Sequence, residues 1–187
     1  MSDSGGTVHN PAGFTQAQWQ ALMVLKNERR GRISEWAEQF SMRYLPGARP
    51  WGVECDVALP CATQNELDKA DAEQLLRQGC HCIAEGSNMG CTAEAVSYLR
   101  DARVLYAPSK AANAGGVSVS GLEMSQNALR LNWNEGEVDE KLHAIMHAIH
   151  GSCVKYGREG DHIDYVRGAN VAGFIKVAEA MLAQGVV

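Results

Sequence analysis

The sequence predicts an α/β protein in which an incomplete parallel sheet of about three strands, with flanking helices, is followed by a set of long helices. Two observations support this fold class. Between residues 51 and 108, short apolar runs alternate with helical segments at close intervals, which is typical of right-handed βαβ units. After Pro108 the strand pattern stops, and only segments with helical periodicity follow.

The first elements along the chain are two predicted helices. The first covers residues 14–30, with Thr15 as its N-cap. The second begins at Ser34, its predicted cap, and ends at Phe40. Before them the chain opens on "SDSGG", which we interpret as a loop with no strand in front of it.

Three strands are expected in the next part of the chain, and each is a short apolar run. Three is few for a doubly wound sheet, since the mean sheet has about 5–6 strands. The sequence therefore indicates a domain that lacks its first part. The expected strands are residues 53–59, 81–86 and 103–108, and the helices between them end at Gly79 and begin at Thr92.

Three long helices complete the chain. We expect them at residues 113–133, 137–157 and 164–184, with Asn134 and Glu137 as a cap pair for the middle one. This divides the chain into a partial dinucleotide-binding, Rossmann-like domain (1–112), without its first βαβ unit, and a C-terminal helical segment (113–187). The last helix carries an apolar stripe of Val171, Phe174, Ile175, Ala178 and Leu182.

Composition excludes several classes of function. The net charge is −5 and basic residues form no long run, so we expect no nucleic-acid partner. No apolar stretch reaches the ~18 residues that span a bilayer, so no membrane is expected. Six cysteines without a secretory signal pattern indicate free thiols and a cytoplasmic location.

An asparagine follows each of the three expected strands: Asn65, Asn88 and Asn113. In parallel α/β sheets the ligand lies beyond the carboxyl ends of the strands. A carboxamide both donates and accepts hydrogen bonds, so it suits ribose hydroxyls or a nicotinamide amide. A single asparagine is more often a helix cap or a turn residue, but three at equivalent strand ends favour a ligand site.

The stretch "AANAGGVSVS" carries two glycines into the first turn of a helix. Free amides there, with the helix dipole, attract an anionic group such as a carboxylate. Ser120 lies four residues after Gly116, so its hydroxyl points to the same side. The alternative stays open: the glycines allow close helix packing and the serine hydroxyl bonds back to the preceding turn.

A metal site is not predicted. His143, His147 and His150 share one face of an expected helix, but no carboxylate accompanies them in an H-E-x-x-H pattern. Cys80 and Cys82 flank His81 in an expected strand, which sends neighbouring side chains to opposite faces. Neither a G-x-G-x-x-G nor a P-loop pattern occurs.

Four long blocks together resemble one known family: "DVALPCATQNELD", "AEGSNM", "KAANAGGVSVSGLEMSQN" and "YVRGANVAGFIKVAEAMLAQGV". They are similar to the C-terminal part of the hexameric, NADP-dependent glutamate dehydrogenases. The resemblance implies the interconversion of L-glutamate with 2-oxoglutarate and ammonium, with NADP(H) as cofactor, in a homo-oligomer. It covers nearly the whole chain, starting at "SDSGGTV".

The resemblance also implies roles for individual residues. Ser120 corresponds to the serine that binds the substrate side-chain carboxylate, Val117 lines the same pocket, and Asn113 lies near both ligands. Asn65 and Asn88 correspond to asparagines at the nicotinamide end of the cofactor. The residues expected to line that approach are Ala62 and Thr63.

The same resemblance places the 2′-phosphate of NADP near Ser2, Asp3, Lys26 and Arg32. Cations and hydroxyl donors suit a phosphate, whereas Asp3 would repel it unless neutralised. The alternative for Lys26 and Arg32 is ordinary solvated surface charge. We expect NADP as the cofactor.

The departures from the family concern what is absent. The family's catalytic lysine and aspartate, its substrate-binding lysines and its glycine-rich turn lie before the matched part, so no catalytic residue is expected here and the isolated chain should be nearly inactive. Gly90 and Cys91 stand where the family has proline and threonine, which should loosen that turn. Two alternatives remain: a related dehydrogenase of leucine, valine or phenylalanine, or a non-catalytic nucleotide-binding or interaction fragment.

Overall fold

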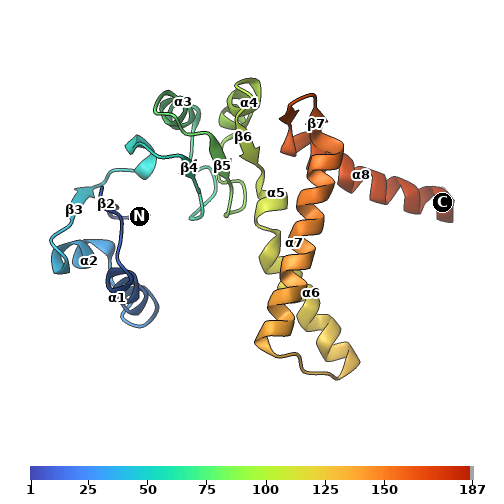
Figure 1. The fold of residues 1–187 in the computed structure, drawn as a ribbon, viewed down its shortest axis with the longest axis horizontal. Coiled ribbons are helices and arrows are strands. Elements are labelled where there is room, and N and C mark those ends of the chain that lie inside the picture. Colours follow the sequence, from blue (N-terminus) through green and yellow to red (C-terminus); the bar gives the residue numbers. More distant parts are fainter. Residues whose placement is uncertain (186–187) are drawn as a thin grey trace. The chain divides into compact units, whose positions relative to one another are not determined.

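The structure is a computed structural model that describes residues 1–185 (Figure 1). The chain forms two compact units, one covering Met1–Glu54 and the other beginning at Cys55. Each unit has its own sheet. Along the described residues, no helix is both long enough and apolar enough to cross a membrane.

The first unit is a three-stranded antiparallel sheet, in the order β1-β2-β3, covered by two helices. Its core is built from the buried side chains of Val8, Leu22, Leu25, Ile33, Trp36 and Ala37. The Trp36 indole donates a hydrogen bond of 2.8 Å to the Gln18 carbonyl, which joins the two helices. The elements are β1 (Ser2–Asp3), β2 (Gly6–His9), α1 (Gln16–Asn27), α2 (Ile33–Gln39), β3 (Arg43–Pro46) and the 3-10 turn η1 (Pro50–Gly52).

The opening of the chain corrects the sequence prediction. "SDSGG" is not a loop without strands, because β1 and β2 form a hairpin there and β2 pairs with β3. A strand of two to four residues is too short for an alternating pattern to reveal, and β3 lies far along the chain. Gly6 is required at the turn, since its φ is 153° and an added Cβ would approach the Leu45 carbonyl oxygen to 2.4 Å.

One helix cap is as predicted and one is wrong. The Thr15 side chain accepts a hydrogen bond from the Gln18 amide and caps α1. α2 begins at Ile33 rather than after Ser34, with Arg32 as its N-cap residue. Ser34 falls inside the first turn because the Asp3 carboxylate, from β1, accepts the Ile33 amide at 3.0 Å.

The second unit contains the parallel sheet that the sequence predicts, in the order β4-β5-β6 (Figure 1). One row across it, Ala58, Ile83 and Tyr106, is buried. The first strand is shorter than the predicted 53–59, since Val53 follows the 3-10 turn. The elements are β4 (Val57–Ala58), α3 (Lys69–Arg77), β5 (Cys82–Ala84), α4 (Ala93–Asp101) and β6 (Leu105–Ala107).

The helical part that follows agrees with the prediction in three long helices. Asn134 caps α7, and its reciprocal pair with Glu137 is present. The hairpin before α8, whose two strands have two residues each, was not predicted from the sequence. The elements are α5 (Ser109–Ala112), α6 (Ala114–Leu129), α7 (Glu135–Gly157), β7 (Arg158–Glu159), β8 (His162–Ile163) and α8 (Tyr165–Gln184).

α7 and α8 approach each other closely at two glycines. A Cβ added to Gly168 would lie 2.1 Å from the Cys153 carbonyl oxygen, and one added to Gly157 would lie 2.3 Å from that of Asp164. Both obstacles are backbone atoms, which cannot move aside as a side chain can. The two glycines therefore set the crossing of the helices.

Asp164 anchors the start of α8 in two ways. Its carboxylate accepts the Arg167 amide as an N-cap and pairs with the Arg100 guanidinium of α4 at 2.6 Å. Burial works to raise the pKa of Asp164, but the hydrogen bond from Arg100 and the capped amides outweigh it and hold the pKa below its usual value. The pair therefore ties the start of α8 to α4.

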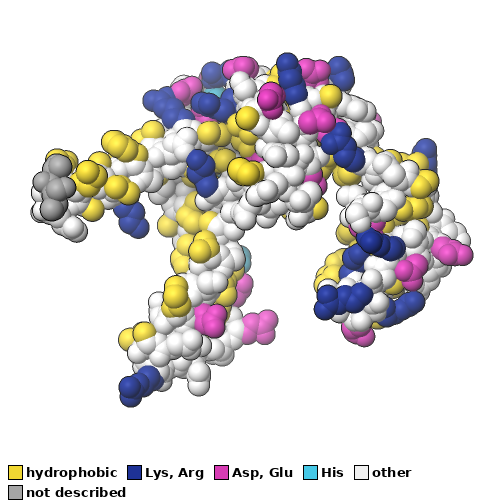
Figure 2. Space-filling view, turned by 180° about the vertical axis from the view of Figure 1, so that it is seen from behind, with side chains coloured by type: hydrophobic (Ala, Val, Ile, Leu, Met, Phe, Trp, Pro, Cys, Tyr) yellow, Lys and Arg dark blue, Asp and Glu magenta, His cyan; other side chains and the backbone are white. Residues whose placement is uncertain are grey.

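The apolar stripe predicted on α8 is only partly covered. Val171, Ile175 and Ala178 are half-buried, whereas Phe174 is 70% exposed and Leu182 is 82% exposed. Figure 2 shows hydrophobic side chains along the arm of the molecule that leads to the grey C-terminal residues. α6 also carries apolar side chains that the described residues of this unit leave largely uncovered, since Val117 is 72% exposed and Met124 is 69% exposed.

Candidate functional site

The loops after β4, β5 and β6 leave the same edge of the parallel sheet, as the sequence analysis assumed. Two of the three predicted asparagines meet there. The Asn113 side-chain amide, at the junction of α5 and α6, donates a hydrogen bond of 2.6 Å to the Asn88 side-chain oxygen, on the loop after β5. Both side chains keep some exposure, so the pair faces solvent rather than the core.

The third asparagine has a backbone role in the same loops. Asn65 adopts a left-handed conformation with φ 55°, which asparagine tolerates better than most residues. Its backbone amide donates to the Met89 carbonyl at 2.7 Å, and this bond ties the loop after β4 to the loop after β5. Its side chain is exposed.

Ala62 and Thr63 present their backbone to this edge. Both amides donate to one oxygen of the Glu66 carboxylate, at 2.7 Å from Ala62 and 3.4 Å from Thr63. The loop is further fixed by Ser87, whose hydroxyl donates to the carbonyls of Pro60 and Thr63. All three strand-end loops are thus held in defined positions.

A buried glutamate, Glu85, bonds both loops that carry the asparagine pair. It is 2% exposed and follows β5. One carboxylate oxygen accepts the Cys91 amide at 2.6 Å, and the other accepts the Ser109 amide at 2.7 Å. Sequence reasoning missed this residue, because a glutamate after a strand gives no local signal of burial.

Two other groups around Glu85 have perturbed ionisation. The pKa of the Cys91 thiol is raised, first by burial and then by the charge of Glu85. The pKa of Tyr106 is raised first by burial and then by the neighbouring Cys91 and Glu85. Both groups are therefore neutral at physiological pH.

The predicted loosening of the turn at Gly90 has a specific structural setting. Gly90 is buried, and an added Cβ would lie 2.8 Å from the Ser87 hydroxyl and 3.1 Å from the Pro60 Cβ. Its carbonyl accepts the Leu67 amide at 3.0 Å. The turn is held by contacts with the neighbouring loop rather than by a proline ring.

The predicted substrate residues lie on the exposed side of α6. The Ser120 hydroxyl donates to the Gly116 carbonyl at a long 3.3 Å, so the back-bonding alternative describes the hydroxyl in this structure. Both Ser120 and Val117 are exposed. Close packing does not explain the two glycines, since a Cβ on Gly116 would meet nothing within 4 Å and one on Gly115 only Leu142 at 3.7 Å.

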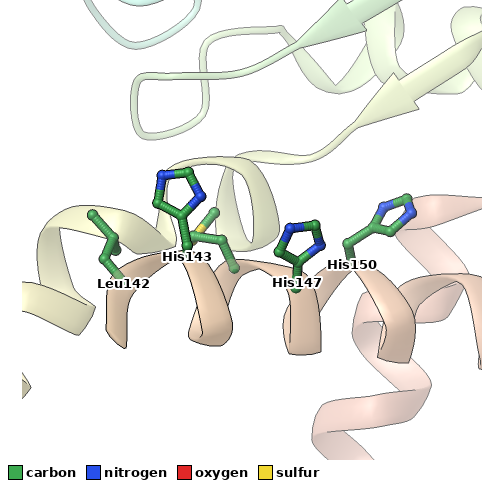
Figure 3. Close-up of a pocket in the computed structure, with 5 residues that line it drawn as sticks. Leu142, His143, His147 and His150 are labelled. Carbon is green, nitrogen blue, oxygen red and sulfur yellow. The ribbon is translucent and has the colours of Figure 1, made fainter. Parts of the chain in front are cut away.

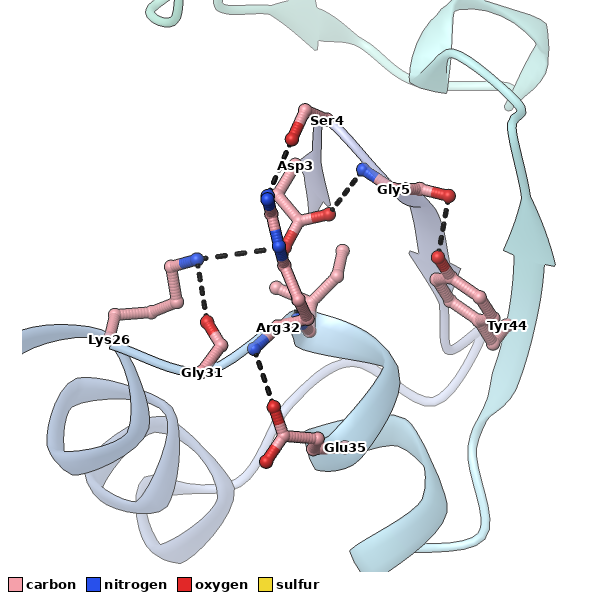
Figure 4. Close-up of polar contacts among 9 residues, drawn as sticks. Asp3, Ser4, Gly5, Lys26, Gly31, Arg32, Glu35 and Tyr44 are labelled. Atoms are coloured by element: carbon pink, nitrogen blue, oxygen red, sulfur yellow. Dashed lines mark hydrogen bonds and ion pairs between the residues drawn. The ribbon is translucent and has the colours of Figure 1, made fainter. Parts of the chain in front are cut away.

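In the first unit, three of the four predicted phosphate residues, Asp3, Lys26 and Arg32, form one polar cluster (Figure 4). Asp3 accepts the amides of Gly5 and Ile33, and Lys26 Nζ lies 3.6 Å from its carboxylate. Arg32 donates to the Ser4 hydroxyl at 2.5 Å. Ser4 was missed by the sequence analysis, whereas Ser2 is exposed on β1 and has no role in these contacts.

The charges in this cluster answer the objection that Asp3 would repel a phosphate. Burial works to raise the pKa of Asp3, but the Ile33 and Gly5 amides and the charges of Lys26 and Arg32 together lower it. The carboxylate is therefore ionised, and the Lys26 and Arg32 charges beside it offset its negative charge. Arg32 remains exposed beside the Ser4 hydroxyl, a combination suited to an anion.

The three histidines of α7 line an open groove of about 390 Å³ with Leu142 and Met146 (Figure 3). His143 lies 3.7 Å from Asp139 on the same helix, and His150 stacks on Tyr165. Within residues 1–185, no three His, Cys, Asp or Glu side chains are grouped as metal ligands.

A parallel sheet whose strand-end loops meet in a polar, partly exposed cluster defines the α/β class in which ligands bind at the carboxyl edge of the sheet. The particular family follows from comparison with known proteins. The model of the Glutamate/Leucine/Phenylalanine/Valine dehydrogenase family matches residues 1–185. The chain belongs to this family, which confirms the resemblance found in the sequence.

Individual relatives are also named as glutamate dehydrogenases. The chain is 57% identical over its whole length to a glutamate dehydrogenase of Bacteroides thetaiotaomicron and 54% identical to the NADP-specific glutamate dehydrogenase of Escherichia coli. It spans 42% of the length of each. Among solved structures, the glutamate dehydrogenase of Plasmodium falciparum superposes with a TM-score of 0.92 at 44% identity, covering all of this chain and 40% of that one.

Proposed function

We propose that this chain is the cofactor-binding, C-terminal portion of a glutamate dehydrogenase that interconverts L-glutamate with 2-oxoglutarate and ammonium. The observation that carries the proposal is the Asn88–Asn113 hydrogen bond at the carboxyl edge of the parallel sheet. Two carboxamides in contact there leave donors and acceptors for the amide group of a nicotinamide. The family and the names of the relatives supply the reaction.

NADP(H) is the proposed cofactor, and when bound it supplies the hydride donor or acceptor. Lys26, Arg32 and Ser4 would hold its 2′-phosphate, because a guanidinium, an ammonium and a hydroxyl can all donate to phosphate oxygens. Asn65, Asn88 and Asn113, with the backbone of Ala62 and Thr63, would orient its nicotinamide end. Relatives named as NADP-specific support this choice, although one relative, 49% identical, is named NAD-specific.

Ser120 and Val117 are proposed to bind the distal carboxylate and the methylene chain of the substrate. Ser120 is exposed and only weakly bonded to Gly116, so its hydroxyl is free to turn toward a ligand. The six cysteines are free thiols, which supports a cytoplasmic location. A homo-hexamer is the proposed assembly of the intact enzyme.

Because the proposed cofactor-binding residues are in this chain and the catalytic residues are not, we predict that the chain alone turns over no substrate. Hydride transfer needs both substrate and cofactor held in a closed cleft, and the proposed catalytic lysine and aspartate are not among these residues. NADPH oxidation with 2-oxoglutarate and ammonium should stay at the buffer rate, while the full-length Bacteroides thetaiotaomicron relative shows robust turnover under the same conditions. Robust turnover by the isolated chain would show that it holds catalytic groups of its own.

A further inference from the structure

The loops after β5 and β6 are joined through side chains at the Asn88–Asn113 pair and at Glu85. Asn88 is on the loop after β5, and Asn113 follows the short helix α5. The Glu85 carboxylate accepts one backbone amide from each loop: Cys91 at 2.6 Å and Ser109 at 2.7 Å.

The Glu85 clasp, defined as the two hydrogen bonds from the Cys91 and Ser109 amides to the Glu85 carboxylate, is strong and specific. Both bonds are short and run from a backbone amide to a carboxylate oxygen, and such charge-assisted bonds are about twice as strong as neutral ones. Glu85 is 2% exposed, so water does not compete for its oxygens. Each oxygen serves a different loop, so a residue with one acceptor cannot replace it.

We propose that Glu85 is a positioning residue that sets the separation of Asn88 and Asn113, and thereby the site for the nicotinamide end of the cofactor. The inference rests on the proposed function for its cofactor, but the clasp itself is a property of the chain. Cys91 N and Ser109 N lie three and four residues from Asn88 and Asn113, so a shift of either loop moves its asparagine. A displacement of about 1 Å in such a group can reduce a rate roughly 100-fold.

The test is the substitution Glu85→Gln in the isotope-labelled chain. Glutamine keeps the shape but turns one acceptor into an amide donor that faces a backbone amide, so the bond to one of the two loops is lost and that loop can shift. By NMR, we expect the chemical shift of the Asn113 side-chain amide, which donates to Asn88 at 2.6 Å, to move toward that of a solvated carboxamide. An unchanged Asn113 side-chain signal in a folded Glu85→Gln chain would overturn the inference.

Asp164→Asn is the matched structural control. It removes the charge paired with Arg100 while asparagine still caps α8, so it lowers stability away from the loops. The Asn113 signal should not change in this variant. A shift of the signal equal to that in Glu85→Gln would show that the clasp has no special role.

A second variant keeps the inference testable if Glu85→Gln does not fold. Asn113→Ala removes the pair and leaves the clasp, and NADPH titration should then shift the Asn88 backbone amide at a roughly ten-fold higher concentration than in the unchanged chain. An unchanged titration midpoint contradicts a binding role for the pair. Absence of any NADPH response in the unchanged chain would count against the proposed function, whereas the NMR signal of the pair, measured without cofactor, still decides the role of Glu85.

Discussion

Replacing Gly168 by alanine is expected to destabilise the second unit by about 3 kcal/mol or more. The new Cβ would lie 2.1 Å from the Cys153 carbonyl oxygen and 2.8 Å from its carbonyl carbon, far inside van der Waals contact. α8 would have to move away from α7, which also strains the Asp164 cap that begins α8. Thermal unfolding followed by circular dichroism should show a Tm lower by roughly 10 °C.

Gly173→Ala is the matched control on the same helix. An added Cβ there meets nothing within 4 Å, and alanine favours a helix over glycine by about 1 kcal/mol. This variant should therefore be slightly more stable than the unchanged chain. Equal Tm values for the two variants would show that the close approach of α7 and α8 does not exist in solution.

The second large effect concerns Ser120 and substrate choice. We expect Ser120→Val to lower kcat/KM for L-glutamate about 100-fold, or about 2.7 kcal/mol, in a chimera that joins this chain to the preceding part of the Bacteroides thetaiotaomicron relative. Valine removes the proposed hydroxyl donor to the distal carboxylate of the substrate, and a hydrogen bond to a charged group contributes about 1.5–3 kcal/mol. Activity with leucine should fall far less, because its side chain has no second carboxylate.

Ser125→Val provides the comparison for this substitution. Ser125 lies on the same helix, is exposed, and its hydroxyl also bonds back one turn, to Gly121 at 2.9 Å. It is not a proposed ligand of the substrate, so its loss should leave kcat/KM for glutamate unchanged. A chimera with Ser120→Val that retains full preference for glutamate would remove Ser120 from the substrate site.

Long or strongly patterned elements could be predicted from the sequence. The parallel sheet followed from three apolar runs separated by helical segments, and α7 followed from its cap pair of Asn134 and Glu137. The strands of the first unit could not be predicted, because β1 and β2 are only two and four residues long, and β2 gains its second pairing partner from the distant Arg43–Pro46. The start of α2 was misplaced for a similar reason, since Asp3 bonds it from another element.

Part of the candidate site could be predicted, because an asparagine recurs after each of the three strands of the parallel sheet. That reasoning selected Asn88 and Asn113, which the structure brings into contact. It could not find Glu85 or Ser4, because the role of each depends on backbone amides or a guanidinium that folding brings to it. A carboxylate that binds amides from two loops has no signature in the local sequence.

The central proposal is that Asn88 and Asn113, in the second unit, bind the nicotinamide end of NADP(H); for the first unit, taken by itself, we propose that Ser4 and Arg32 bind a 2′-phosphate. The most direct test is an NMR titration of the labelled chain with NADPH and, separately, with NADH. We predict that both cofactors shift the signals of Asn88 and Asn113, whereas only NADPH, which carries the 2′-phosphate, shifts those of Ser4 and Arg32. Equal responses of Ser4 and Arg32 to both cofactors, or no response of the asparagine pair to either, would contradict the account.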